Sequence, residues 1–252
     1  MPNWCTTNMT IRGPKAEIAR MLTFMQGQRG EEAHNPFDFN RLIPMPEELG
    51  QTVKGSHQAH GLAILDANSS ERDYRNALAY LAHSDPAFAQ PGGDGQAFLE
   101  RHRAQELLRA STHETVRECL HQAELSLQAR QKYGVNDWYE WSVSNWGTKW
   151  NSCEARVDEP MVLGDEASVS IVFDTAWSFP LPVMQKFAEV FDKLTFDLCA
   201  DEEGGFFYLD GHGEGGRLEI TEFEGVRQGG PYDRSEDEDE DNATPEEASA
   251  EG

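Results

Sequence analysis

The motif that most resembles a cofactor site is the glycine-rich stretch 211–216, Gly-His-Gly-Glu-Gly-Gly. It fits the Gly-x-Gly-x-x-Gly pattern, in which the backbone approaches a pyrophosphate held at the start of a helix. Here a strand-like segment, residues 217–220, follows instead of a helix. The sequence therefore favours a flexible hairpin loop and predicts no dinucleotide cofactor.

Other residue types that could support catalysis or metal binding are isolated. Glu118 and His121 are one helical turn apart, but di-iron bundles need a second such motif and further glutamates. His57 and His60 share a polar segment without a third ligand nearby. Ser178 precedes a predicted helix, where an N-cap role explains it, and it lacks a Gly-x-Ser-x-Gly turn. We predict no metal ion and no catalytic residue.

Aromatic residues are concentrated between positions 138 and 150, five of them in thirteen positions. Tyr139, Trp141 and Val143 alternate with polar residues, a period typical of a strand with one buried face. Gly147 then predicts a bulge or tight bend. This stretch contains no strong nucleophile, so its role is structural or in binding.

Base stacking is the alternative to burial for these tryptophans, because ferredoxin-like RNA-binding sheets expose aromatic side chains beside Lys and Arg. Only one basic residue, Lys149, lies in the stretch. We therefore expect Trp141, Trp146 and Trp177 to be buried, whereas one or two others remain candidates for lining a groove. The residues assigned to this structural or possible binding motif are Trp4, Trp141, Asn145, Trp146, Gly147, Thr148, Lys149, Trp150 and Trp177.

The first part of the chain opens with a strand and a helix. Residues 3–12 alternate as a strand, and a helix follows Pro14, a good first-turn residue. A short strand is predicted over 37–43, and residues 50–70 show no period and are interpreted as a loop or insert. Three helices are predicted within 70–134.

The third of these helices is predicted to begin at Ser111, which has capping-box spacing to Glu114. A strand over 168–177, a helix capped by Ser178, a hairpin over 196–209 and a last strand over 217–223 complete the pattern.

This order predicts an α+β fold with a ferredoxin-like antiparallel sheet on which two helices pack. We expect one domain over residues 1–230, with a helical insertion at about 70–134. Residues 231–252 are mainly acidic and lack a core-forming pattern, so we predict that they form a disordered acidic tail.

The formal net charge is −24 over 252 residues, and the segment from Asp233 onward contributes −9 of it. The remaining −15 disfavours binding to phosphate backbones, so we expect no direct duplex DNA binding and an easier fit to a basic host or element-encoded protein. No apolar run approaches the roughly 20 residues of a membrane span. The start of the chain shows no secretory signal, and four separated cysteines are expected to be reduced and buried, so we expect a cytoplasmic protein.

Three short motifs carry a family resemblance: Met-Pro-Asn-Trp-Cys at the start, Asn-Trp-Gly-Thr-Lys-Trp at 145–150 and Thr-Ala-Trp-Ser at 175–178. On these the chain resembles the YubB-like family of plasmid and phage proteins over most of residues 1–225. Family members usually have Thr-Pro-Trp-Ser-Pro-Pro where this chain has Thr-Ala-Trp-Ser-Phe-Pro. The resemblance implies a ferredoxin-like fold and an origin in mobile elements, with no catalytic residues to transfer.

The hypothesis for function is a non-enzymatic interaction or accessory protein of a mobile genetic element that acts through protein–protein contacts. The alternatives are an acidic anti-defence protein that mimics DNA, and an undetected enzyme. Rows of acids at the phosphate spacing of a duplex would favour mimicry, whereas acids scattered among Lys and Arg would favour a role in solubility.

Overall fold

The computed structural model describes residues 2–27, 35–89 and 97–233. The chain divides into two compact units, one made of Met1–Pro44 and Asn145–Gly252 and the other of Met45–Ser144. The sequence predicted a single domain with an insertion at about 70–134, so the inserted unit is longer than expected. Of the predicted acidic tail, residues 234–252 lie outside the described part of the chain.

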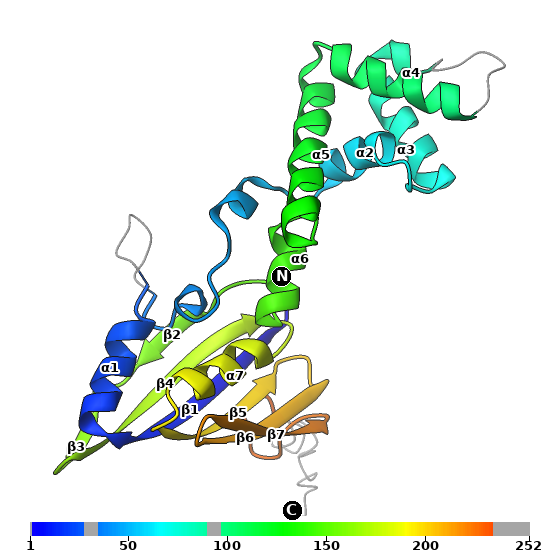
Figure 1. The fold of residues 1–252 in the computed structure, drawn as a ribbon. Coiled ribbons are helices and arrows are strands. Elements are labelled where there is room, and N and C mark those ends of the chain that lie inside the picture. The colour runs from blue at the N-terminus through cyan, green and yellow to red at the C-terminus, as the bar shows by residue number, and fades with distance from the viewer. Residues whose placement is uncertain (1, 28–34, 90–96, 234–252) are drawn as a thin grey trace, which may run out of the picture. The chain divides into compact units, whose positions relative to one another are not determined.

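The first unit contains an antiparallel sheet with the strand order β2-β4-β1-β5-β6-β7, and β3 also pairs with β4. Its strands are β1 (Trp4–Pro14), β2 (Cys153–Val157), β3 (Met161–Leu163), β4 (Glu166–Ala176), β5 (Thr195–Glu202), β6 (Phe207–Glu214) and β7 (Arg217–Glu224). Helices α1 (Lys15–Met25) and α7 (Leu181–Val190) lie on one face of this sheet (Figure 1). Strands β2 and β3 had not been predicted.

The connections identify the fold. Helix α1 follows β1 and α7 links β4 to β5, and in each split β-α-β unit another strand lies between the two connected strands. The order β2-β4-β1-β5 with antiparallel pairing is that of a ferredoxin-like sheet, to which β6 and β7 are added. The predicted α+β, ferredoxin-like class is confirmed.

The core of this unit lies between the sheet and the two helices. Along β1 the alternating residues Cys5, Met9 and Ile11 are buried, as the predicted strand required. Phe37 stacks on Phe173 of β4 with ring centroids 5.0 Å apart. Burial of such aromatic side chains supplies much of the apolar area that stabilises a unit of this size.

The second unit is helical. It contains α2 (Ser56–Leu65), α3 (Glu71–Ala82), α4 (Ala97–Ala110), α5 (Glu114–Tyr133) and the start of α6 (Trp138–Trp146). Buried residues of α2, α3, α4 and α5 share one core, which includes Tyr74, Phe88 and Cys119. At Gly61 an added Cβ would overlap the backbone carbonyl of Cys119, so α2 and α5 pack in close contact.

The stretch 138–150 differs most from its prediction, because it begins with helix α6 and contains no strand. Residues 138, 141, 142, 145 and 146 also have helical spacing, and Trp141, Ser142 and Trp146 are buried while Val143 and Ser144 are exposed. The sequence also carried a start signal: the Asp137 carboxylate accepts a hydrogen bond from the Glu140 amide at 2.9 Å. This is the N-cap geometry that frees a helix end from unpaired donors.

Further predictions changed in their details. The segment predicted as a loop over 50–70 contains α2, and the strand predicted over 37–43 is a 3-10 turn, Phe39–Arg41. Ser111 does not cap α5, because its hydroxyl donates to Asp85 at 2.8 Å.

The glycine-rich stretch also differs from its prediction. Residues 211–214 belong to β6, and the turn is confined to Gly215 and Gly216.

Candidate interaction site: three tryptophans at one end of the sheet

Three indole rings from distant parts of the chain meet at one end of the sheet. Trp4 and Trp150 have ring centroids 6.1 Å apart, and Trp150 stacks on Trp177 at 6.4 Å with an angle of 23° between the ring planes. The Lys149 ammonium lies 4.3 Å from the Trp150 ring centre and 5.0 Å from that of Trp177. We call Trp4, Trp150 and Trp177 the three-tryptophan cluster.

Strand pairing places two of the three rings. Trp4 begins β1 and is paired with Ala176, the last residue of β4, so Trp177 follows directly beside it. The Trp177 amide donates to the Asn3 carbonyl at 2.8 Å, and the Glu203 amide donates to the Trp4 carbonyl at 2.9 Å. The segments that contain Trp177 and Glu203 are therefore hydrogen-bonded to the start of β1, one on each side.

The third ring is placed by the loop that follows α6. Gly147 follows the helix with φ +79°, which confirms the predicted bend. Glycine is favoured there because it adopts this φ without strain and because a Cβ would lie only 2.8 Å from Pro182. The buried Thr148 hydroxyl donates to the Ala176 carbonyl at 2.9 Å, and the Ser178 hydroxyl donates to the Gly147 carbonyl at 2.6 Å. These bonds fasten the loop that carries Trp150 to the end of β4.

Ser178 consequently has a different role from the predicted one. Helix α7 begins at Leu181 without a side-chain cap. The Ser178 hydroxyl instead joins the two segments that carry Trp150 and Trp177, so it is not the N-cap of α7.

Trp177 has the least expected environment. It was predicted to be buried, yet 44% of it is exposed, and its φ is +67°. The left-handed region costs a residue with a Cβ roughly 1–2 kcal/mol. The Thr175 hydroxyl donates to the Ser178 carbonyl at 2.8 Å and so helps to hold this conformation. Strained and exposed aromatic residues of this kind are typical of binding sites.

The remaining predicted motif residues have structural positions. Trp141 and Trp146 are 7% and 4% exposed, which confirms their predicted burial. The Trp146 indole N–H donates to the Ile43 carbonyl at 2.9 Å. Asn145 is half-buried within α6, and Trp141 belongs to the second unit. The structure therefore brings Trp4, Lys149, Trp150 and Trp177 together and uses the others for packing.

Acidic and polar groups border the cluster on the sheet face away from the helices. Thr6 shares that face with Trp4, since they are two residues apart on one strand. Its hydroxyl donates to Asp174 at 2.7 Å and lies 2.8 Å from the Tyr232 hydroxyl. Burial raises the pKa of Tyr232, so it stays a neutral phenol beside this carboxylate.

The segment after β7 returns across this face, which sequence patterns did not indicate. Arg227 forms ion pairs with Asp201 and Asp210, each at 2.8 Å, and its guanidinium lies 4.7 Å from the centre of the Tyr208 ring. The chain up to Asp233 is therefore part of the sheet unit. The sequence signal for this return of the chain is Arg227, a basic residue beyond the last strand that can pair with carboxylates on the sheet.

The two pairs of possible metal ligands, Glu118 with His121 and His57 with His60, have neighbours other than a metal site. Glu118 on α5 accepts a hydrogen bond from Gln122 at 3.0 Å, and His60 stacks on Tyr80 at 4.0 Å. Burial lowers the pKa of His60. Within residues 2–27, 35–89 and 97–233, no group of three or more His, Cys, Asp or Glu side chains is placed to hold a metal ion.

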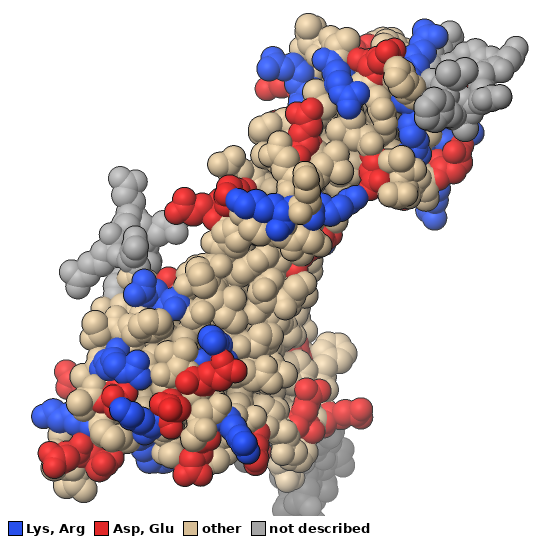
Figure 2. Space-filling model, viewed as in Figure 1, with Lys and Arg blue, Asp and Glu red and all other residues tan. Residues whose placement is uncertain are grey.

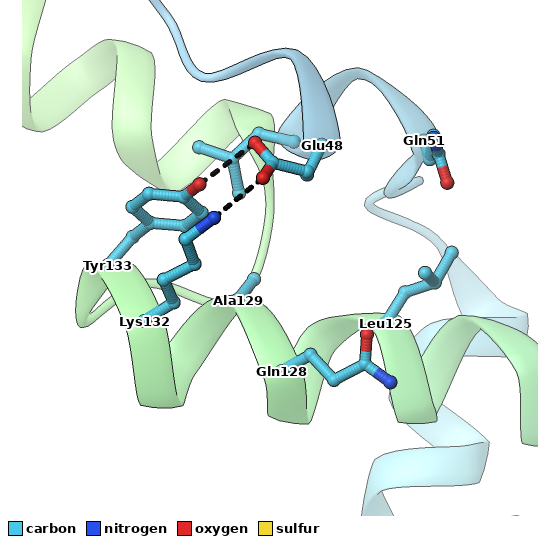
Figure 3. A pocket seen from close by; sticks show the side chains of 8 residues that line it. Glu48, Gln51, Leu125, Gln128, Ala129, Lys132 and Tyr133 are labelled. Atoms are coloured by element: carbon cyan, nitrogen blue, oxygen red, sulfur yellow. Dashed lines mark hydrogen bonds and ion pairs between the residues drawn. The ribbon is translucent and has the colours of Figure 1, made fainter.

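A hollow of about 210 Å³ in the second unit lies beside Glu48, Lys132 and Tyr133 (Figure 3). Lys132 Nζ lies 2.6 Å from one Glu48 oxygen, and the Tyr133 hydroxyl donates to the other at 2.9 Å. The Lys132 contact is the largest of the effects that lower the pKa of Glu48 to about 2. These polar groups satisfy one another, and the hollow is smaller than ordinary ligand sites of roughly 300–1,000 Å³. It is a weaker candidate than the cluster.

The sheet with its two helices defines an α+β protein with a ferredoxin-like domain. Residues 145–244 match the family model described as the ferredoxin-like domain in Api92-like protein. Among solved structures the chain is similar to protein Api92 from Yersinia pseudotuberculosis, with 12% identity, a TM-score of 0.41 and coverage of 90% of this chain and 100% of that one. No curated protein sequence matches the chain.

The family model matched over residues 145–244 corrects the resemblance drawn from short motifs, because it describes a domain of Api92-like proteins and not of the YubB-like family. Two of those motifs, 145–150 and 175–178, are the segments that the Ser178–Gly147 and Thr148–Ala176 hydrogen bonds join. Motifs that build one turn of a shared fold are a weak guide to the family, since unrelated proteins reuse a fold.

Proposed function

We propose that this protein acts by binding another protein, without catalysing a reaction, and that the three-tryptophan cluster is its contact site. The observation that carries the proposal is Trp177, which is 44% exposed, strained and stacked on Trp150 beside the Lys149 ammonium. Tryptophan is enriched among residues that dominate binding energies. A ring already held in place loses little conformational entropy when a partner covers it.

Charge favours a protein partner over a nucleic acid. The chain up to residue 232 carries a net charge of −15, and Asp174 lies two residues from the paired end of β4 at the cluster. A phosphate backbone would be repelled by this surface, whereas a basic protein would be attracted at moderate salt. We therefore propose a basic protein partner and no direct binding to duplex DNA.

Charges on the inserted helices support solubility more than DNA mimicry. Residues 70–134 contain nine Asp or Glu and eight Lys or Arg. Figure 2 shows acidic and basic side chains interspersed over these helices, without a continuous acidic row on the visible face. A mixed surface of this kind keeps a protein soluble and does not reproduce the field of a duplex.

The cysteines do not favour catalysis by a thiolate nucleophile. Burial raises the pKa of all four thiols, to about 12 for Cys5 and about 11 for Cys119. Nucleophilic cysteines need the opposite shift. All four are free thiols, of which Cys153 and Cys199 are only half-buried, and this supports the proposed cytoplasmic location.

No helix within the described residues is long and apolar enough to cross a membrane. The mobile-element origin depended on the YubB-like resemblance, and the family correction removes its support.

The test is affinity capture with the full-length protein, in which Trp177→Ala is compared with wild type. Val143→Ala is the matched control, because Val143 is also 44% exposed but lies on α6. We expect Trp177→Ala to weaken binding of a captured partner by at least about tenfold, the effect of a hot-spot tryptophan. The control should bind as wild type.

The same preparation should show no shift of duplex DNA in a gel assay. Equal capture by wild type and Trp177→Ala would remove the cluster from the proposal. Turnover of a substrate that is lost on one polar-to-Ala change in the folded region would overturn the non-enzymatic assignment.

A further inference from the structure

A second surface feature lies at strand β3, at the other end of the β1–β4 pair. Met161, Val162 and Leu163 are 75%, 50% and 86% exposed. Three consecutive apolar residues in a strand usually place at least one side chain in the core, whereas here all three face solvent. An exposed apolar edge of this kind marks an interaction surface.

The backbone of β3 is also available on one side. The strand pairs with β4 in the register Met161–Ser168, Val162–Ala167 and Leu163–Glu166. Within the described residues no strand pairs with its other edge. Because backbone groups alternate in direction along an antiparallel strand, part of the β3 N–H and C=O groups point away from β4. They can pair with an added strand.

This edge is anchored and adjoins an open hollow. The Lys15 amide donates to the Asp165 carbonyl in the β3–β4 turn at 2.8 Å, so the hairpin is tied to the start of α1. A hollow of about 490 Å³ lies against Met161, Leu163 and Arg12. An added strand therefore has a fixed template and a place for one apolar side chain.

Carboxylates flank the apolar residues on both sides. Asp158 and Glu159 precede β3, Asp165 and Glu166 follow it, and all four are exposed. None of these four forms an ion pair with another described residue. The edge thus presents an acidic–apolar–acidic pattern, whose complement is an apolar strand with Lys or Arg at both ends.

We propose that the β3 edge binds an extended segment of a basic protein, which adds to the sheet as an antiparallel or parallel strand. Main-chain hydrogen bonds provide the pairing, the apolar side chains cover Met161, Val162 and Leu163, and terminal Lys or Arg residues meet the four carboxylates. A second copy of this chain fits poorly, since edge-to-edge pairing would bring two sets of carboxylates together.

This surface is separate from the three-tryptophan cluster. Trp4 opens β1, whereas Gly13 at the far end of β1 pairs with Ala167, the β4 partner of Val162. Nine residues at about 3.3 Å per residue place the two surfaces roughly 30 Å apart. The inference therefore goes beyond the proposed function and can fail without it.

The probe is a synthetic peptide, Lys-Lys-Thr-Val-Thr-Val-Thr-Val-Lys-Lys, titrated into isotope-labelled full-length protein and followed by NMR. An acidic twin has Glu in place of the four lysines, and a third peptide is the basic one with alternate central amides N-methylated. We expect the basic peptide to shift the amide signals of β3 and to bind more weakly as salt rises from about 0.05 M to about 0.3 M. The acidic and N-methylated peptides should not bind.

Variants separate the apolar and charged contributions. Leu163→Thr keeps strand propensity and should weaken binding of the basic peptide about tenfold, since it removes one apolar contact. Val226→Thr, at a residue 45% exposed beyond β7, is the control and should bind as wild type. Glu159→Lys combined with Glu166→Lys should weaken the basic peptide and allow the acidic one to bind.

Trp177→Ala should leave binding of the basic peptide unchanged, which distinguishes failure of this inference from failure of the cluster proposal. Absence of binding by the basic peptide would overturn the inference. Equal binding by its N-methylated form would exclude strand addition, and wild-type affinity of Leu163→Thr would remove β3 from the contact.

Discussion

Replacing Trp177 by glycine and by alanine separates backbone strain from the loss of the ring. Both variants lose the stacking on Trp150 and the contact with Lys149, so these losses cancel in the comparison. They differ in the left-handed backbone conformation, φ +67°, which glycine adopts without penalty and alanine does not. In almost every other surface position alanine would be the more stabilising of the two.

The magnitude follows from two opposing effects. Alanine in the left-handed region costs about 1–2 kcal/mol in the folded state. Glycine adds unfolded-state entropy, which costs about 0.4–1 kcal/mol of stability relative to alanine. We therefore expect Trp177→Gly to have a free energy of unfolding about 0–1.6 kcal/mol higher than Trp177→Ala, with a midpoint of about 0.8 kcal/mol. For a chain of this size each kcal/mol corresponds to about 2–4 °C in Tm.

The assay is urea unfolding of both full-length variants, followed by circular dichroism, with Phe206→Gly and Phe206→Ala as a control pair. Phe206 is 73% exposed and is not among the described residues with positive φ. At Phe206 alanine should be the more stable by about 0.4–1 kcal/mol. If alanine is also the more stable at Trp177, the surrounding hydrogen bonds do not impose the strained turn, and the argument from strain to a binding role is refuted.

Three further predictions concern the core and one ion pair. Trp146→Ala should lower the free energy of unfolding by about 3–5 kcal/mol in chemical denaturation, because a buried indole and its hydrogen bond are lost, and unchanged stability would place the ring outside the core. Gly61→Ala should cost about 1–3 kcal/mol, since its Cβ would overlap the backbone of α5, whereas Gly50→Ala, with open space around it, should not destabilise the protein. The hydrogen bond that His212 Nδ1–H donates to the Asp197 carboxylate raises the pKa of His212 above 6.5, so this contribution to stability is complete below pH 6.5 and is lost as pH rises through the raised value. In Asp197→Asn an NMR titration should show the pKa of His212 falling back toward 6.5, and an unchanged value would mean that the two side chains do not interact in solution.

Local patterns were sufficient for much of the fold. The alternation in residues 3–12 corresponds to β1, the apolar repeat of α1 faces the core, and Gly134 ends α5 with φ +76°. Each of these features is determined by residues close in sequence. The ferredoxin-like class followed because the order of strands and helices allows few sheet topologies.

The tertiary structure decided whether residues 138–146 form a strand or a helix, because their apolar residues fit both a period of two and the spacing of a helix. Alternation at Tyr139, Trp141 and Val143 predicted a strand, whereas Trp138, Trp141 and Trp146 also suit a helix. Helix α6 forms with Asp137 at its N-cap, and Trp141 and Trp146 are buried. The Asp137–Glu140 spacing was the local signal that could have decided between them.

The candidate site shows the same division between local and long-range information. The sequence identified the tryptophans, Lys149 and the bend at Gly147, but it assigned Trp177 to the core. Trp146 and Trp177 are the same residue type with a similar apolar preference, yet one is 4% and the other 44% exposed. The difference arises from contacts between segments that are distant in sequence: the Trp177 amide donates a hydrogen bond to the Asn3 carbonyl at the other end of the chain, and its ring stacks on Trp150 from the loop after α6. Residue type determined that these rings would be energetically important, and only the packing of β1, β4 and the 147–150 loop decided which of them reach solvent.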